Sequence, residues 1–179
     1  MTLDEICRKA EFLKNEYKTN NPETLCRDLG ICLLYQPMGT HPGAIKGFAL
    51  GVDGVFSVVV NSDLSAEVRW IIIAHEIFHT LEHCSDRICS YHDVALFDEI
   101  SEMEKEANLF AAELLLSDED VMGVLNSDNT FFTAAATLCV PIELLDFKFR
   151  IMKRKGYQLA EPPVHSHNDF LKKIKVENE

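Results

Sequence analysis

The sequence contains no long apolar run. Its longest strictly apolar stretch near the middle, Trp70 to Ala74, is far shorter than the roughly 20 residues that a membrane-crossing helix needs. The first ten residues carry charged side chains on Asp4, Glu5, Arg8 and Lys9 and no apolar core of the kind found in secretory signals. We therefore expect a soluble, cytoplasmic protein without a membrane partner.

Basic residues are also scarce. The chain has 17 Lys and Arg against 29 Asp and Glu, which gives a formal net charge of −12. A surface that binds nucleic acid neutralises phosphates with Lys and Arg, so this balance argues against a broad phosphate-binding surface. A basic protein or peptide is the easier partner for such a chain.

No pair of the six cysteines has the CxxC spacing of common metal and redox motifs. Scattered cysteines in a chain without a secretory signal favour reduced thiols over a disulfide framework. Cys84 and Cys89 lie near several histidines, but two loop thiols are a simpler reading than a second metal site.

The length and the hydrophobic pattern predict one domain of the α+β class. A chain of 179 residues with 47% hydrophobic content can bury one substantial core. We expect a mostly helical fold with a small antiparallel three-stranded sheet. Helical periodicity or capping signals occur at 3–17, 21–30, 65–83, 98–116 and 117–125, and strand patterns at 31–36, 47–52 and 55–61. The expected N-caps are Asn21, which precedes Pro22, and Ser65 and Ser117, and Asp53-Gly54 predicts a tight hairpin between the last two strands. The polar stretch at 85–93 is expected to be irregular.

The end of the chain has a different character. Residues Thr130 to Gly156 predict two helices around a turn at Cys139 to Pro141, and this pair resembles a helix-turn-helix. We expect a main domain over 1–129, with the helix-turn-helix-like appendage at 130–160 packed on it. The charged residues 161–179 should form a loosely ordered tail.

The strongest chemical signal is the sequence HEIFH at positions 75–79. On a helix, His75 and His79 lie on the same face, where two imidazoles can bind one metal ion. Glu76 stands beside them as the candidate general base. The surrounding run is rich in isoleucine, and burying these polar groups there would be costly without a bound partner.

A catalytic zinc ion needs three protein ligands and one open position. His83 continues the spacing, but it lies about 12 Å from His75 along the helix axis and is therefore a poor third ligand. A glutamate from the following helix would complete a His₂Glu set. Glu106 is favoured because it opens the small and apolar segment EANLFAAELLL, and Glu102 is the runner-up. Glu99 and Glu104 are read as ordinary residues of a solvated helix face.

HEIFH followed by EANLFAAELLL resembles the ImmA/IrrE family of zinc metallopeptidases, over about Leu3 to Leu159. The resemblance implies a zincin-like fold in which His75, His79 and Glu106 bind Zn²⁺ and Glu76 is the catalytic acid and base. Ser117 departs from the pattern, since the family often has proline after these leucines.

The resemblance also implies a zinc-dependent endopeptidase that cleaves a helix-turn-helix repressor of a phage, mobile element or stress regulon. Tyr91, His83 or His92 could help to stabilise an oxyanion, and the sequence does not choose among them. The alternative is a DNA-binding transcriptional regulator with a structural zinc site, which the late basic cluster favours and the net charge opposes. The sequence leaves the oligomeric state open.

Overall fold

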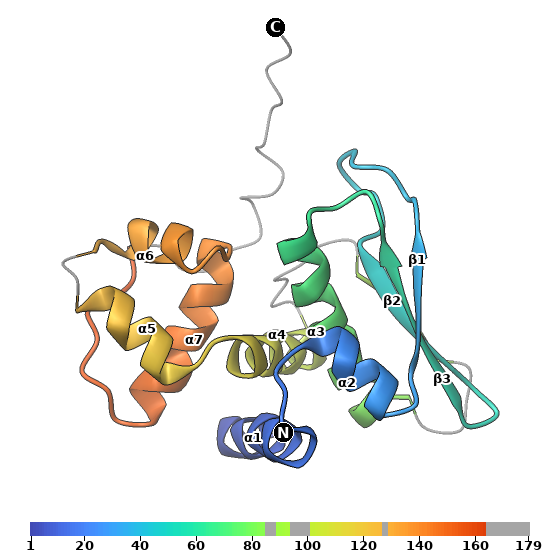
Figure 1. The fold of residues 1–179 in the computed structure, drawn as a ribbon, viewed down its shortest axis with the longest axis horizontal. Coiled ribbons are helices and arrows are strands. Elements are labelled where there is room, and N and C mark those ends of the chain that lie inside the picture. The colour runs from blue at the N-terminus through green and yellow to red at the C-terminus, as the bar shows by residue number, and fades with distance from the viewer. Residues whose placement is uncertain (85–88, 94–100, 127–128, 164–179) are drawn as a thin grey trace, which may run out of the picture.

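The computed structural model describes residues 1–84, 89–93, 101–126 and 129–163, and describes no side chains for 89–93. Within these residues the fold is α+β and mostly helical, as the sequence predicts (Figure 1). None of the helices in these ranges is long and apolar enough to cross a membrane. The elements are α1 (Leu3–Tyr17), α2 (Pro22–Asp28), β1 (Cys32–Gln36), β2 (Gly47–Val52), β3 (Val55–Asn61), α3 (Ala66–Glu82), β4 (Cys89–Asp93), α4 (Glu102–Leu115), α5 (Asp118–Leu125), α6 (Phe131–Thr137) and α7 (Ile142–Arg154).

Helix starts follow the capping residues in the sequence. The side chain of Asn21 accepts hydrogen bonds from the backbone N–H groups of residues 23 and 24, and Pro22 occupies the first helical position of α2. Ser65 caps α3 and Ser117 caps α5 through the same kind of contact. Each cap satisfies N–H groups that have no partner inside the helix, which fixes where the helix begins.

The sheet differs from the one expected. Its strand order is β1-β3-β2-β4, and β1 pairs with β3 in parallel, so the prediction of an antiparallel three-stranded sheet is wrong. The β2–β3 hairpin is as predicted, since Asp53 and Gly54 both adopt positive φ at its turn. Strand β3 lies between β1 and β2, and it is parallel to β1 and antiparallel to β2. A fourth strand, β4, pairs with β2 within a stretch that the sequence suggests is irregular.

Small residues on β2 let α3 pack closely against the sheet. A Cβ atom added to Gly47 would lie 2.4 Å from Cγ2 of Ile72, and one on Gly51 would lie 3.3 Å from Cβ of Cys84. Ala49, between the two glycines on the same face, is fully buried. Because α3 lies so near this strand, the middle of the helix is held between the sheet and the rest of the core.

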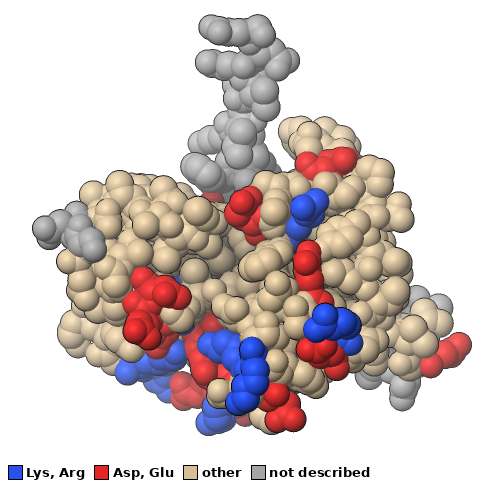
Figure 2. Space-filling view, in the orientation of Figure 1, with Lys and Arg blue, Asp and Glu red and all other residues tan. Residues whose placement is uncertain are grey.

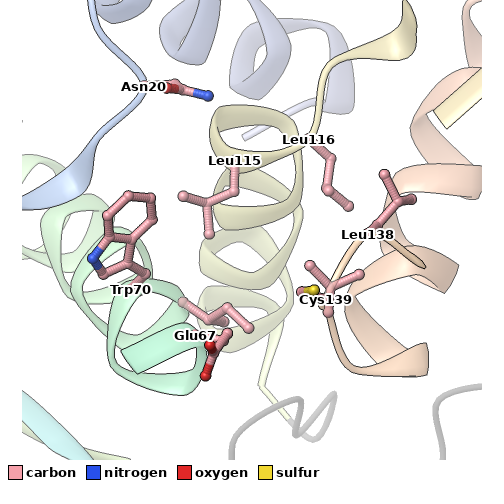
Figure 3. A pocket seen from close by; sticks show the side chains of 9 residues that line it. Asn20, Glu67, Trp70, Leu115, Leu116, Leu138 and Cys139 are labelled. Carbon is pink, nitrogen blue, oxygen red and sulfur yellow. The ribbon is translucent and has the colours of Figure 1, made fainter. Parts of the chain in front are cut away.

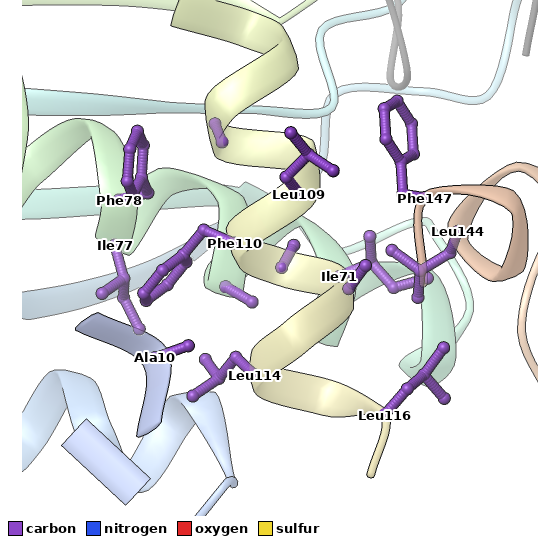
Figure 4. Close-up of a cluster of buried hydrophobic side chains, with 14 of the residues drawn as sticks. Ala10, Ile71, Ile77, Phe78, Leu109, Phe110, Leu114, Leu116, Leu144 and Phe147 are labelled. Carbon is purple, nitrogen blue, oxygen red and sulfur yellow. The ribbon is translucent and has the colours of Figure 1, made fainter. Parts of the chain in front are cut away.

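The core continues on the other side of α3, where α4 packs against it. The rings of Phe78 on α3 and Phe110 on α4 have centroids 5.2 Å apart, and Ala10 of α1 lies near Leu114 of α4 (Figure 4). Both α3 and α4 are therefore enclosed on several sides, which buries the middle of each helix.

The C-terminal helices α5, α6 and α7 form a group on the far side of α4 from the sheet (Figure 1). The two helices expected between Thr130 and Gly156 are present as α6 and α7. Cys139 has φ of +55° in the turn that joins them. Helix α7 packs on α4, so this group shares the central core.

Candidate metal centre

Helix α3 presents two buried imidazoles on one face. The side chains of His75 and His79 are each 1% exposed, and their Nε2 atoms lie 2.9 Å apart. They are four positions apart along the helix, so their side chains are neighbours on one face. Two imidazole nitrogens that face each other at this distance are well placed to share one cation.

Helix α4 brings a carboxylate to the same point. Oε2 of Glu104 lies 3.0 Å from Nε2 of His75, and Oε1 lies 3.3 Å from Nε2 of His79. One ligand atom from each residue lies within 4.8 Å of the other two. The Glu104 side chain is 24% exposed, so the group is open to solvent on the carboxylate side. These residues fit a metal ion of the kind that His₂Glu sets bind, with room for a further ligand.

The electrostatics of this group favour an ionised glutamate. Burial by itself raises the pKa of the Glu104 carboxyl, but the hydrogen bonds and the charges of His75 and His79 outweigh burial. The net effect is a pKa well below the ordinary value. Glu104 is therefore an anion throughout the physiological range, which is the form that binds a cation.

Asn108 supports the first histidine from the other side. Its Oδ1 lies 3.0 Å from Nδ1 of His75, and its side chain is buried. Asn108 follows Glu104 by one turn of α4, so both residues face α3. An acceptor at Nδ1 keeps the proton on that nitrogen and leaves Nε2 with a lone pair for metal. Sequence reasoning missed Asn108, although an amide inside the apolar run of EANLFAAELLL was a signal.

His83 lies behind the second histidine. Its Nδ1 is 2.9 Å from Nδ1 of His79, on the side of the ring away from Glu104. The backbone N–H of His83 caps the end of α3 by donating to the carbonyl of His79. Burial, followed by the nearby His79, lowers the pKa of His83. His83 is thus the C-cap residue of α3, and it is not one of the three residues grouped as possible ligands.

Glu106, the expected third ligand, does not lie in the His75–His79 group. Its carboxylate pairs with the N-terminal ammonium of Met1. The runner-up, Glu102, has an 84% exposed side chain with Lys105 at 3.8 Å. Residues 104 and 106 point about 200° apart around the helix axis, so only one of them can face α3. Glu104, which the sequence analysis assigned to a solvated face, is the one that does.

Glu76 sits between the two histidines in α3, and its side chain is fully buried. A Cβ atom on Gly47 would lie 3.8 Å from Cγ of Glu76, so the acid lies beside the start of β2. Two of the oxyanion candidates, Tyr91 and His92, are on β4, and their side chains lie outside the described part of the structure.

An apolar pocket lies elsewhere on the molecule. Its volume is about 250 Å³, and it opens between the start of α3, the end of α4 and the α6–α7 turn (Figure 3). Trp70, Leu115 and Cys139 are among its lining residues. None of the three residues His75, His79 and Glu104 lines this pocket, so the pocket is separate from the candidate metal centre.

Two helices that hold a His₂Glu group, with an acid beside the first histidine, define a metallopeptidase. The chain belongs to the family of IrrE N-terminal-like domains, Peptidase_M78, whose model matches residues 26–150. It is also 32% identical over 139 residues to "Uncharacterized immunity region protein 2" of Bacillus phage phi105, a match that covers 78% of this chain and 85% of that protein.

Proposed function

We propose that this protein is a zinc-dependent endopeptidase in which His75, His79 and Glu104 hold the metal and Glu76 is the general base. One observation carries the proposal: two buried imidazole nitrogens and one anionic carboxylate from two helices meet at a single point. The open side at Glu104 supports a catalytic site over a structural one, since structural zinc sites are closed by four protein ligands.

The residues divide the work of peptide hydrolysis. Zinc, when bound, supplies a Lewis acid that lowers the pKa of a water and polarises the scissile carbonyl. Glu76 accepts the proton of the attacking water and later delivers a proton to the departing amine. Asn108 and the packing of α3 against β2 keep the ligands in place between turnovers.

We further propose that the substrate is a helix-turn-helix repressor of a phage, mobile element or stress regulon. The phi105 relative is named as an immunity region protein of a phage, which supports a phage-related substrate. The net charge of −12 favours an encounter with a basic, DNA-binding protein. The family resemblance points to the same class of substrate.

The alternative, a DNA-binding regulator, depended on the basic cluster of α7. In the structure these side chains are all paired with carboxylates: Lys148 with Glu113 and Asp118, Arg150 with Asp146, Lys153 with Glu161, Arg154 with Asp4, and Lys155 with Glu113 and Asp118. Figure 2 shows blue and red side chains interspersed on the visible face. Lys and Arg that are already neutralised contribute little to phosphate binding, so the peptidase is favoured.

The test is a cleavage assay with the purified chain, Zn²⁺ and the repressor encoded nearest to its gene. Wild-type protein should cleave the repressor, and a chelator should stop cleavage. Glu76→Gln should bind zinc as wild type does yet lose at least a hundredfold in rate, because an amide cannot accept the proton. Glu67→Gln, at an exposed position of the same helix, is the matched control and should cleave normally.

Full activity of Glu76→Gln would show that the assigned base is wrong. Salt-dependent binding of duplex DNA at micromolar protein, without any cleavage of the repressor, would favour the regulator instead.

A further inference from the structure

The two histidines of the candidate metal centre are arranged alike. Each directs Nε2 toward Glu104, and each has a polar side chain at hydrogen-bond distance from Nδ1. For His75 that side chain is Asn108, and for His79 it is His83. The two partners come from different helices, since Asn108 is on α4 and His83 ends α3.

The His83 ring has a defined position. Its backbone N–H caps α3, its ring stands edge-on to Phe78 with centroids 5.7 Å apart, and its centroid lies 5.1 Å from that of His79. The residue is half-buried. A residue that is held at its backbone and whose ring packs against Phe78 can fix the orientation of the His79 ring beside it.

The chemistry of imidazole then assigns a role. A neutral His79 that gives its Nε2 lone pair to a metal carries its proton on Nδ1, and this N–H needs an acceptor. Nδ1 of His83, at 2.9 Å, is an acceptor when the His83 proton is on Nε2. His83 cannot itself be a fourth ligand in this arrangement, because it faces the Nδ1 side of His79 and the centre is on the Nε2 side.

We propose that His83 is a positioning residue for the metal centre, which accepts the Nδ1–H of His79 and so sets the tautomer and the angle of that ligand. This inference rests on the proposed function, because it needs a metal at Nε2. Losing such a partner typically lowers metal affinity by about 10- to 100-fold.

The test compares zinc affinities, measured by competition with a chromogenic chelator, across a set of variants. His83→Leu removes the acceptor, and its zinc dissociation constant should rise by about tenfold or more. His83→Asn places an amide oxygen close to the former Nδ1 position, and its affinity should stay within about threefold of wild type. His41→Leu, at an exposed histidine far along the chain, is the control and should bind as wild type does.

Thermal unfolding of the apoproteins, monitored by circular dichroism, shows that the variants are folded at the temperature of the titrations. Equal zinc affinity of wild type and His83→Leu would overturn the role of His83. Equal weakening in His83→Leu and His83→Asn would also overturn it, because the acceptor would then be irrelevant. If wild type binds no zinc, or if His79→Ala binds it normally, the proposed function itself fails, and the two failures are thereby distinguished.

Discussion

Lys148 of α7 donates a hydrogen bond to Oε2 of Glu113 on α4 at 2.6 Å, and both side chains are at most 1% exposed. Asp118, at the start of α5, lies 2.5 Å from the same ammonium. Lys155 pairs with the other oxygen of Glu113 at 2.6 Å. This charge network joins the C-terminal helices to α4, the helix that carries Glu104. We therefore expect that breaking it lowers the stability of the whole fold.

Replacing Lys148 with methionine should lower the free energy of unfolding by about 3 kcal/mol, because Glu113 would keep its buried charge and lose its principal partner. Urea denaturation of the two proteins measures this difference. Lys153→Met is the control: Lys153 pairs with Glu161, whose side chain is 82% exposed, and its loss should cost less than about 1 kcal/mol. Equal effects of the two substitutions would contradict the buried network.

Gly47→Ala should destabilise the protein by about 1–3 kcal/mol, since the new methyl group would overlap Cγ2 of Ile72 and push α3 away from β2. Gly123→Ala is the matched control within α5, where an added Cβ meets nothing within 4 Å. It should be neutral or stabilise by about 0.5–1 kcal/mol, because alanine is the better helix former. Chemical denaturation reports both values, and a tolerated Gly47→Ala would show that α3 and β2 are not in close contact.

The described cysteines should differ sharply in reactivity. Cys32 and Cys139 are exposed, whereas Cys26 is buried and Cys7 is half-buried. Burial raises the pKa of Cys26 to about 12 and that of Cys7 to about 11. Since the thiolate is the reactive form, iodoacetamide at pH 8 should label Cys32 and Cys139 first and leave Cys26 unmodified in the native state. Peptide mass spectrometry measures this order, and early labelling of Cys26 would contradict its burial.

Local signals in the sequence predicted much of the fold. Asn21 with Pro22, and Ser65, located the starts of α2 and α3, because capping depends on residues that are close in sequence. Asp53 and Gly54 located the hairpin for the same reason. The parallel pairing of β1 with β3 was not predicted, since it depends on how a ten-residue connection crosses the sheet, and no local pattern records that.

The candidate site was predicted in the same uneven way. HEIFH predicted two candidate ligands and an acid on one helix, where spacing alone decides which residues share a face. To predict the third candidate ligand, one has to know how α4 is rotated about its own axis relative to α3. The glutamates at 102, 104 and 106 show no clear periodicity from which this rotation could be read. Asn108 is the residue that indicates which face of α4 packs against α3. A buried amide had to face a polar partner on α3, and Glu104 is one turn before it on the same face.

The division of the chain at 129 and 130 stays a proposal. The C-terminal helices are joined to α4 by the buried pair of Glu113 and Lys148 as well as by apolar packing.

The central claim is that Glu104, together with the two histidines of α3, holds the metal, and that Glu106 does not. The direct test is the zinc dissociation constant of Glu104→Gln beside that of Glu106→Gln, two like substitutions two residues apart. We predict that Glu104→Gln weakens zinc binding by at least about a hundredfold, through loss of an anionic ligand, and that Glu106→Gln changes it less than about threefold. Strong weakening in Glu106→Gln, with wild-type affinity in Glu104→Gln, would contradict the account.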